Sequence, residues 1–130
     1  MKKNNKGFTL AELLIVVAII AVLTAIAIPV FTTQLERSRE ATDMSNLRAA
    51  YAEVMANYLA NGAKVGSTPS TTTTATVTPK QTRSGWQNAE NGTLYVRVNG
   101  VEKSISAAAK TSGTWTVSIN PSKSELVVVS

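Results

Sequence analysis

The chain has 130 residues, of which 44% are hydrophobic and 16% are charged, and its formal net charge is +5. It contains no cysteine and no histidine, which excludes disulfide-stapled folds, thiolate metal sites and histidine-dependent catalysis. Its eight acidic residues are mostly far apart, so the composition predicts no catalytic residue, metal site or cofactor and argues against an enzyme. The basic residues after the first seven are scattered, so we expect no specific nucleic-acid surface.

Residues 1–7 form a short polar leader. Lys2, Lys3 and Lys6 place three positive charges directly before an apolar segment. Basic residues at such a position favour a cytoplasmic amino terminus. We therefore expect a single pass through a membrane, with the amino terminus in the cytoplasm and the rest of the chain on the outer side.

Residues 8–31 are overwhelmingly apolar. From Leu13 to Ile28 the only polar side chain is Thr24, whose hydroxyl can bond back to the helix backbone. With its flanks the segment has membrane-spanning length, roughly 20 residues. Glu12 is the anomaly, because a carboxylate within a spanning segment costs about 3 kcal/mol at the helix centre and less near an interface.

Residues 32–61 have the pattern of an amphipathic helix. Apolar residues recur at spacings of three and four and predict one core-packing face: Met44, Leu47, Tyr51, Val54 and Tyr58. Asn61-Gly62 is a plausible carboxyl-terminal cap. Only Pro29 interrupts the pattern, so we expect one helix from Phe8 to Ala60, kinked near Pro29 and about 80 Å long.

Charged residues gather early in this second helical half: Glu36, Arg37, Arg39, Glu40 and Asp43. Their spacing predicts a solvated helix face with pairs three and four residues apart. Salt bridges between copies of the chain are the alternative.

The remaining chain predicts a connecting loop and then short strands. Residues 62–91 are rich in threonine and are expected to form an exposed connecting loop, with a glycosylated or adhesive loop as the alternative. Residues 92–130 alternate in hydropathy and predict four strands, which include a hairpin at Asn99-Gly100 and a final strand over Leu126–Val129. The expected fold class is α+β, with a long amino-terminal helix whose second half packs on a small, roughly four-stranded antiparallel sheet. Residues 32–130 would form this globular headpiece.

The start of the chain is similar to that of a known family. Lys6-Gly7 followed by Phe8-Thr9-Leu10-Ala11-Glu12 resembles the class III leader and first mature residues of type IV pilins and pseudopilins. The resemblance implies cleavage between Gly7 and Phe8 and N-methylation of Phe8. Pro29 matches the helix-kinking proline of the family. The disulfide near the carboxyl terminus of many relatives is missing here.

The resemblance also implies a function and partners. The chain would be a structural subunit of a type IV pilus, polymerised through its apolar helix into an extracellular filament of identical or related pilins. A prepilin peptidase would process it, and an inner-membrane assembly platform and ATPase would assemble it. Glu12 would pair with the Phe8 amine of a neighbouring subunit, since a charge in a weakly screened apolar bundle needs a partner.

Other interpretations stay open. The chain could be a pseudopilin of a type II secretion or DNA-uptake system, although no aspartate follows Asp43 to supply the calcium loop common in secretion pseudopilins. The apolar segment could also be a secretory signal cut after Ala25-Ile-Ala27, or an uncut anchor. In either case the sheet domain would act alone as a secreted or membrane-anchored binding module.

Overall fold

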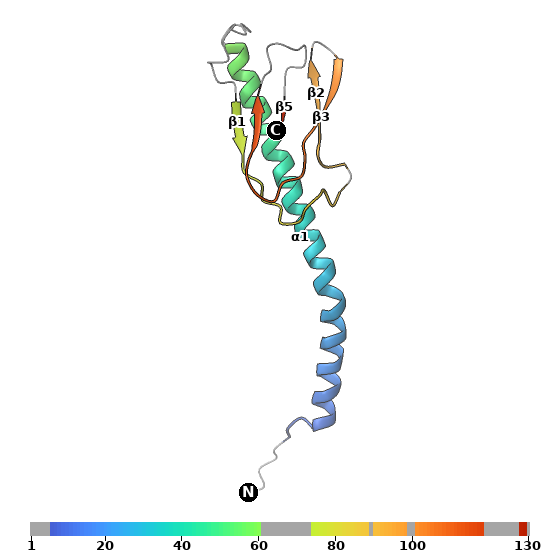
Figure 1. Cartoon of the computed structure of the whole chain (residues 1–130). Helices are drawn as coiled ribbons and strands as arrows, with labels where there is room; N and C mark the ends of the chain where they lie inside the picture. The colour runs from blue at the N-terminus through green and yellow to red at the C-terminus, as the bar shows by residue number, and fades with distance from the viewer. Residues whose placement is uncertain (1–5, 61–73, 89, 99–100, 119–127, 130) are drawn as a thin grey trace. The chain divides into compact units, whose positions relative to one another are not determined.

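The computed structural model describes residues 6–60, 74–88, 90–98, 101–118 and 128–129. Their contacts divide the chain into two compact units, Met1–Leu35 and Glu36–Ser130. One helix, α1 (Leu10–Ala60), extends through both, and five strands follow in the second unit (Figure 1). These are β1 (Thr74–Val77), β2 (Thr93–Val98), β3 (Val101–Ser106), β4 (Trp115–Ser118) and β5 (Val128–Val129). The predicted α+β class is confirmed.

The apolar and amphipathic segments form one helix, α1, so that prediction is confirmed. It begins at Leu10 instead of Phe8 and continues through Pro29 to Ala60. Proline cannot donate to the carbonyl four residues before it, so it removes one helical hydrogen bond. The hydroxyls of Thr32 and Thr33 donate to the Pro29 carbonyl at 3.0 Å each. The kink stays a prediction, and the predicted cap at 61–62 lies outside the described residues.

The described strands form two antiparallel sheets, so the prediction of one roughly four-stranded sheet was wrong. One sheet has the order β1-β4-β5 and the other is the hairpin β2-β3. The central strand β4 pairs with β1 along one edge and with β5 along the other. Among the described residues, no strand pairing joins the hairpin to this sheet.

Strand β1 lies within the segment expected to be a connecting loop. Ala75 and Val77 are buried while Thr74 and Thr76 are exposed, which is the alternation of a half-buried strand. Ala75 pairs with Val117 of β4, and Val77 pairs with Trp115. Two apolar residues among many threonines give too short a pattern to recognise, but threonine is β-branched and fits a strand once a partner is present.

The predicted hairpin and final strand are confirmed in part. In the β2-β3 pair, Val98 is opposite Val101, which leaves only Asn99 and Gly100 between the strands. Those two residues lie outside the described part. Of the strand predicted over 126–129, the described portion is Val128–Val129.

The core of the second unit lies between α1 and the strands, as the apolar stripe predicts (Figure 1). Met44, Leu47 and Val54 are buried, and Tyr51 and Tyr58 pack against them half-buried. Burial of a large aliphatic side chain contributes about 1.5–3 kcal/mol. This stripe therefore anchors the headpiece to the second half of the helix.

A stacked tryptophan pair completes this core. The rings of Trp86 and Trp115 lie 6.1 Å apart at an interplanar angle of 8°. The Trp86 Nε1–H donates to the Ala107 carbonyl at 3.0 Å, and the Trp115 Nε1–H donates to the Ala108 carbonyl at 2.7 Å. Both indole donors are thus satisfied, as burial of this side chain requires.

Three acidic residues of α1 are buried, so the prediction that they lie on a solvated face was wrong. The exposed fractions are 1% for Glu36 and 0% for both Glu40 and Asp43. We call these three residues the carboxylate row. Their positions continue the apolar stripe of Leu47 and Val54 at helical spacing, so they lie on the face that packs against the rest of the headpiece.

Backbone N–H groups of residues 80–88 satisfy the carboxylate row. Asp43 accepts from Lys80 at 2.8 and 2.9 Å and from Gln81 at 2.9 Å. Glu40 accepts from Gln87 at 2.6 Å and from Asn88 at 3.2 Å. A buried carboxylate is tolerated when several donors reach it. The carboxylate row therefore holds residues 80–88, which belong to none of the described strands.

Glu36 has the richest set of donors. It accepts from the N–H groups of Thr82 and Arg83 and from the Thr82 hydroxyl, and Arg39 lies 3.2 Å away as an ion pair. Burial by itself would raise the pKa of this carboxyl, but the hydrogen bonds outweigh it and lower the pKa from 4.5 to about 2. Of the charge pairs predicted at spacings of three and four, the described residues contain the pair of Arg39 with Glu36, three residues apart.

Candidate functional site

The amino-terminal end of α1 is closed by a capping box. The Thr9 N–H donates to Oε2 of Glu12 at 2.9 Å, and the Glu12 N–H donates to the Thr9 hydroxyl at 3.2 Å. The Leu13 N–H donates to the Thr9 carbonyl at 3.1 Å, which makes Thr9 the cap and Leu10 the first helical residue. Sequence reasoning missed the role of Thr9, although Thr-x-x-Glu before an apolar run is a known signal.

Gly7 and Phe8 lie outside the helix, because Thr9 caps its amino-terminal end and Leu10 is its first residue. Both are exposed, and Phe8 keeps 89% of its surface accessible. A Cβ built at Gly7 would meet no atom within 4 Å. The peptide bond between them therefore lies in accessible, non-helical backbone, which is the form that a protease needs.

The apolar half of α1 is uncovered in a single chain. Its large apolar side chains from Leu10 to Phe31 are 48–76% exposed. Helix α1 is long and apolar enough near the amino terminus to cross a membrane, by length and composition. Thr24 donates its hydroxyl to the Ile20 carbonyl at 2.9 Å, as predicted, which satisfies the one hydroxyl between Leu13 and Ile28.

The predicted site residues fall in two places on this helix. Gly7, Phe8 and Glu12 lie together around its first turn, whereas Pro29 lies well inside it. Glu12 is exposed, and no described residue donates a hydrogen bond to its Oε1. One carboxylate oxygen thus serves the cap while the other is available to a second group.

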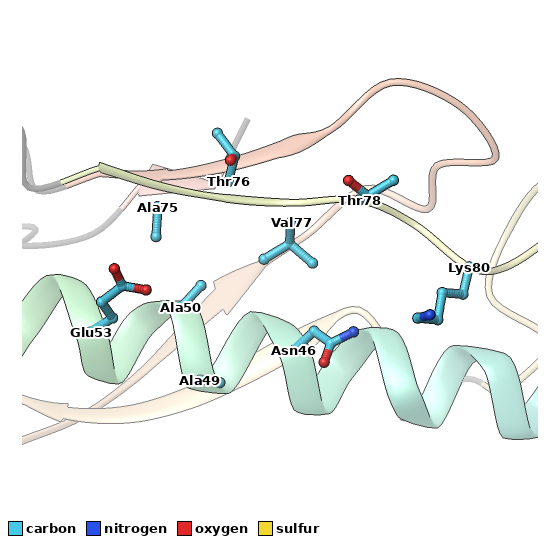
Figure 2. Close-up of a pocket in the computed structure, with 9 residues that line it drawn as sticks. All are labelled: Asn46, Ala49, Ala50, Glu53, Ala75, Thr76, Val77, Thr78 and Lys80. Carbon is cyan, nitrogen blue, oxygen red and sulfur yellow. The ribbon is translucent and has the colours of Figure 1, made fainter.

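A groove of about 380 Å³ lies between α1 and β1 in the second unit. Figure 2 shows Ala75 and Val77 pointing towards the helix and Thr76 and Thr78 pointing away from it. Among the described residues that line the groove, Glu53 is the one acid and Lys80 is the one base. Among the described residues, no cluster of three or more His, Cys, Asp or Glu side chains could hold a metal ion.

Comparisons with known proteins bear on the amino-terminal segment. The family model described as the prokaryotic N-terminal methylation motif matches residues 2–28. The chain is 55% identical over 48 residues to the type IV major pilin protein PilA of Myxococcus xanthus. It is 56% identical over 45 residues to a type IV major fimbrial protein FimA of Dichelobacter nodosus. No solved structure matches this chain.

These matches cover 37% and 35% of this chain, and only 22% and 29% of the two relatives. The type IV pilin family consists of structural subunits and not of enzymes, in agreement with the composition. Residues 2–28 are thus a prokaryotic N-terminal methylation motif, and the resemblance to type IV pilins predicted from the leader and Glu12 is confirmed.

Proposed function

We propose that this chain is a structural subunit of a type IV pilus filament, made as a membrane-anchored precursor. The observation that carries the proposal is the continuous exposed apolar surface of residues 8–31, which begins at a capped helix end beside the leader. In a single chain this surface needs lipid, and in a filament it can pack against the same surface of neighbouring subunits. The similarity to major pilins of two bacteria supports the same function.

Processing would create the charge that assembly uses. A prepilin peptidase would remove residues 1–7, and the new amine of Phe8 would be methylated while keeping its positive charge. This amine would pair with Glu12 of a neighbouring subunit. The free Oε1 of Glu12 supports this pairing, because the carboxylate can accept the amine without giving up the Thr9 cap. The assembly platform and ATPase of such systems are the further partners that we propose.

Amino-terminal sequencing of sheared surface filaments tests the proposal. The expected result is that this chain is a main component of the filaments and begins at an N-methylated Phe8. A mature chain that begins at Ile28, or an uncut chain that stays in the membrane, would refute the filament function in favour of a separate binding module. Absence from abundant surface filaments, with correct processing at Phe8, would favour a pseudopilin.

A further inference from the structure

Asn91 precedes Gly92 in the turn that leads into β2. The chain contains three Asn-Gly pairs, at 61–62, 91–92 and 99–100, and the structure describes the second of them. Asparagine is among the thermolabile residues. A glycine after it has no side chain to shield its backbone nitrogen. The pair at 91–92 is therefore a candidate site of chemical modification.

The reaction in question is deamidation, which needs no enzyme, oxidant or metal ion. The Gly92 nitrogen attacks the side-chain carbonyl carbon of Asn91, Cγ, and forms a bond to it. The bond between Cγ and Nδ2 breaks, and Nδ2 leaves as ammonia with the proton that the Gly92 nitrogen gives up. Water then opens the cyclic imide to aspartate or isoaspartate. The reaction thus requires a free Gly92 nitrogen, a mobile Asn91 amide and access for water.

Helix α1 occupies both reacting nitrogens. Nδ2 of Asn91 donates to Oε2 of Glu40 at 2.9 Å, and the Gly92 N–H donates to Sδ of Met44 at 3.3 Å. The Gly92 carbonyl accepts from the Ala107 N–H at 2.7 Å, which fixes the backbone on the other side of the residue. Gly92 is buried, so water has little access to it. The closed structure therefore withholds each of the three requirements of the reaction.

We propose that Asn91 is a latent deamidation site, which Glu40 and Met44 keep closed and which reacts when its turn opens locally from α1. The residues before the turn, 80–88, belong to none of the described strands and are held by the carboxylate row. A segment without a strand ladder opens at a lower free energy than the core. The rate in the folded chain is then the intrinsic rate multiplied by the population of the open form.

The product would prevent the turn from closing again. An aspartate at position 91 cannot donate to Oε2 of Glu40 and places a second carboxylate beside it. Glu40 is fully buried, so the repulsion between the two charges is weakly screened. The N–H groups of Gln87 and Asn88 bond to the same carboxylate and would lose part of their hold. One reaction thus makes a reversible opening permanent and turns Asn91 into a one-way switch that operates as the protein ages.

The experiment follows position 91 in the full chain in detergent at mildly alkaline pH. Peptide mapping by mass spectrometry assigns the mass change from amide to acid to this position and separates it from the other two Asn-Gly pairs. The rate in the folded chain is divided by the rate in the same variant unfolded in guanidinium chloride, so that intrinsic reactivity cancels. Glu40→Gln weakens the acceptor of the Asn91 amide, and Met44→Leu removes the sulfur with little change in volume. Glu53→Gln changes an exposed acid of the same helix and is the matched control.

We expect the wild type to react at least about 10-fold more slowly when folded than when unfolded, because only the open form reacts. Glu40→Gln should raise the ratio of folded to unfolded rate about 5-fold or more, since it leaves buried donors without their charged partner. Met44→Leu should raise the ratio as well, and Glu53→Gln should leave it unchanged. Equal rates in the folded and unfolded wild type would overturn the inference. Ratios for Glu40→Gln and Met44→Leu that both equal the wild-type ratio would overturn it too.

Asn91→Asp tests the consequence of the reaction directly, because it installs the product. The amides of Gln87 and Asn88 should exchange hydrogen about 5-fold faster or more than in the wild type, since their acceptor is disturbed. Asn57→Asp makes the same chemical change at an exposed position of α1 and should leave this exchange unchanged. Equal exchange at positions 87 and 88 in the two aspartate variants would refute the one-way switch.

Discussion

Thr9 and Glu12 satisfy each other's backbone N–H groups through their side chains at the first turn of α1. The carboxylate that was expected to act only between subunits therefore also has a role within its own chain. The two roles use different atoms, because Thr9 occupies Oε2 and leaves Oε1 free. Substitutions at the two positions can separate them.

Glu12→Gln should reduce filament yield sharply and leave the helix start intact. Glutamine can serve at this position of a capping box, so the substitution removes the charge and keeps the cap. The Phe8 amine would then lack its partner in a weakly screened core. Thr9→Ala is the matched control: it removes the hydroxyl at a cost of about 1 kcal/mol to the helix start and keeps the carboxylate. Sheared filaments and membrane-fraction chain are compared by immunoblot, and a greater loss with Thr9→Ala would show that the cap is what assembly requires.

Gly7→Leu should leave an uncut precursor in the membrane. A Cβ at position 7 would meet no atom within 4 Å apart from its chain neighbours, so we expect the fold to accept a side chain there and any effect to arise in the peptidase. Gly7→Ala is the control with a small side chain and should still be cut. Electrophoretic mobility and amino-terminal sequence are the measurements. Leucine-variant chain of mature size would contradict the predicted cleavage site.

Glu40→Gln should destabilise the headpiece by about 1–3 kcal/mol. Both oxygens of Glu40 accept hydrogen bonds, from the Gln87 and Asn88 N–H groups and from the Asn91 side-chain amide at 2.9 Å. Glutamine has one acceptor oxygen, so its amide group would face donors. Thermal unfolding in detergent measures the effect, with exposed Glu53→Gln as a control that should change stability by less than about 0.5 kcal/mol. Equal melting temperatures for the two variants would show that the buried contacts contribute nothing.

The stability that Glu36 supplies should depend on pH. Its folded-state pKa of about 2 lies below the ordinary value of 4.5, so its ionised form stabilises the fold fully above that ordinary value. This stability is lost as pH falls from 4.5 towards 2. The difference in unfolding free energy between the wild type and Glu36→Gln should therefore shrink over that range. Denaturant titrations at several pH values measure it, and a constant difference would contradict the lowered pKa.

Gly92→Ala should destabilise the headpiece more than Gly113→Ala. Both glycines have a left-handed backbone, with φ of 87° and 79°. A Cβ at position 92 would lie 2.6 Å from Cδ1 of Trp86, whereas at position 113 it would meet nothing within 4 Å. Each substitution carries a backbone cost of roughly 1–2 kcal/mol, and only the first also displaces the Trp86 ring from Trp115. Chemical denaturation of both variants measures the difference in unfolding free energy. Equal losses would show that the Trp86 ring moves aside without loss of stability.

The sequence by itself determined the features that depend on local pattern. An unbroken apolar run defined the first half of α1, and helical spacing of Met44, Leu47 and Val54 defined the buried face of the second half. Alternation defined the β2-β3 hairpin. A basic leader, Gly7, Phe8 and Glu12 carried the resemblance to type IV pilins, because these residues form a short, contiguous motif. Each of these patterns lies within a few turns of helix or one strand pair.

Only the tertiary structure decided which of the charged residues from 36 to 43 are buried and which are exposed. Helical spacing places Glu36, Glu40 and Asp43 on the face of Leu47, but a carboxylate on that face is stable only if donors reach it. The backbone donors come from residues 37 to 48 positions further along the chain, which no local pattern reveals. Long-range pairing with β4 likewise makes part of the threonine-rich segment a strand, β1. Glu36, Glu40 and Asp43 are buried whereas Arg37, Lys80 and Arg83 are exposed, since only the folded chain decides which charges face solvent.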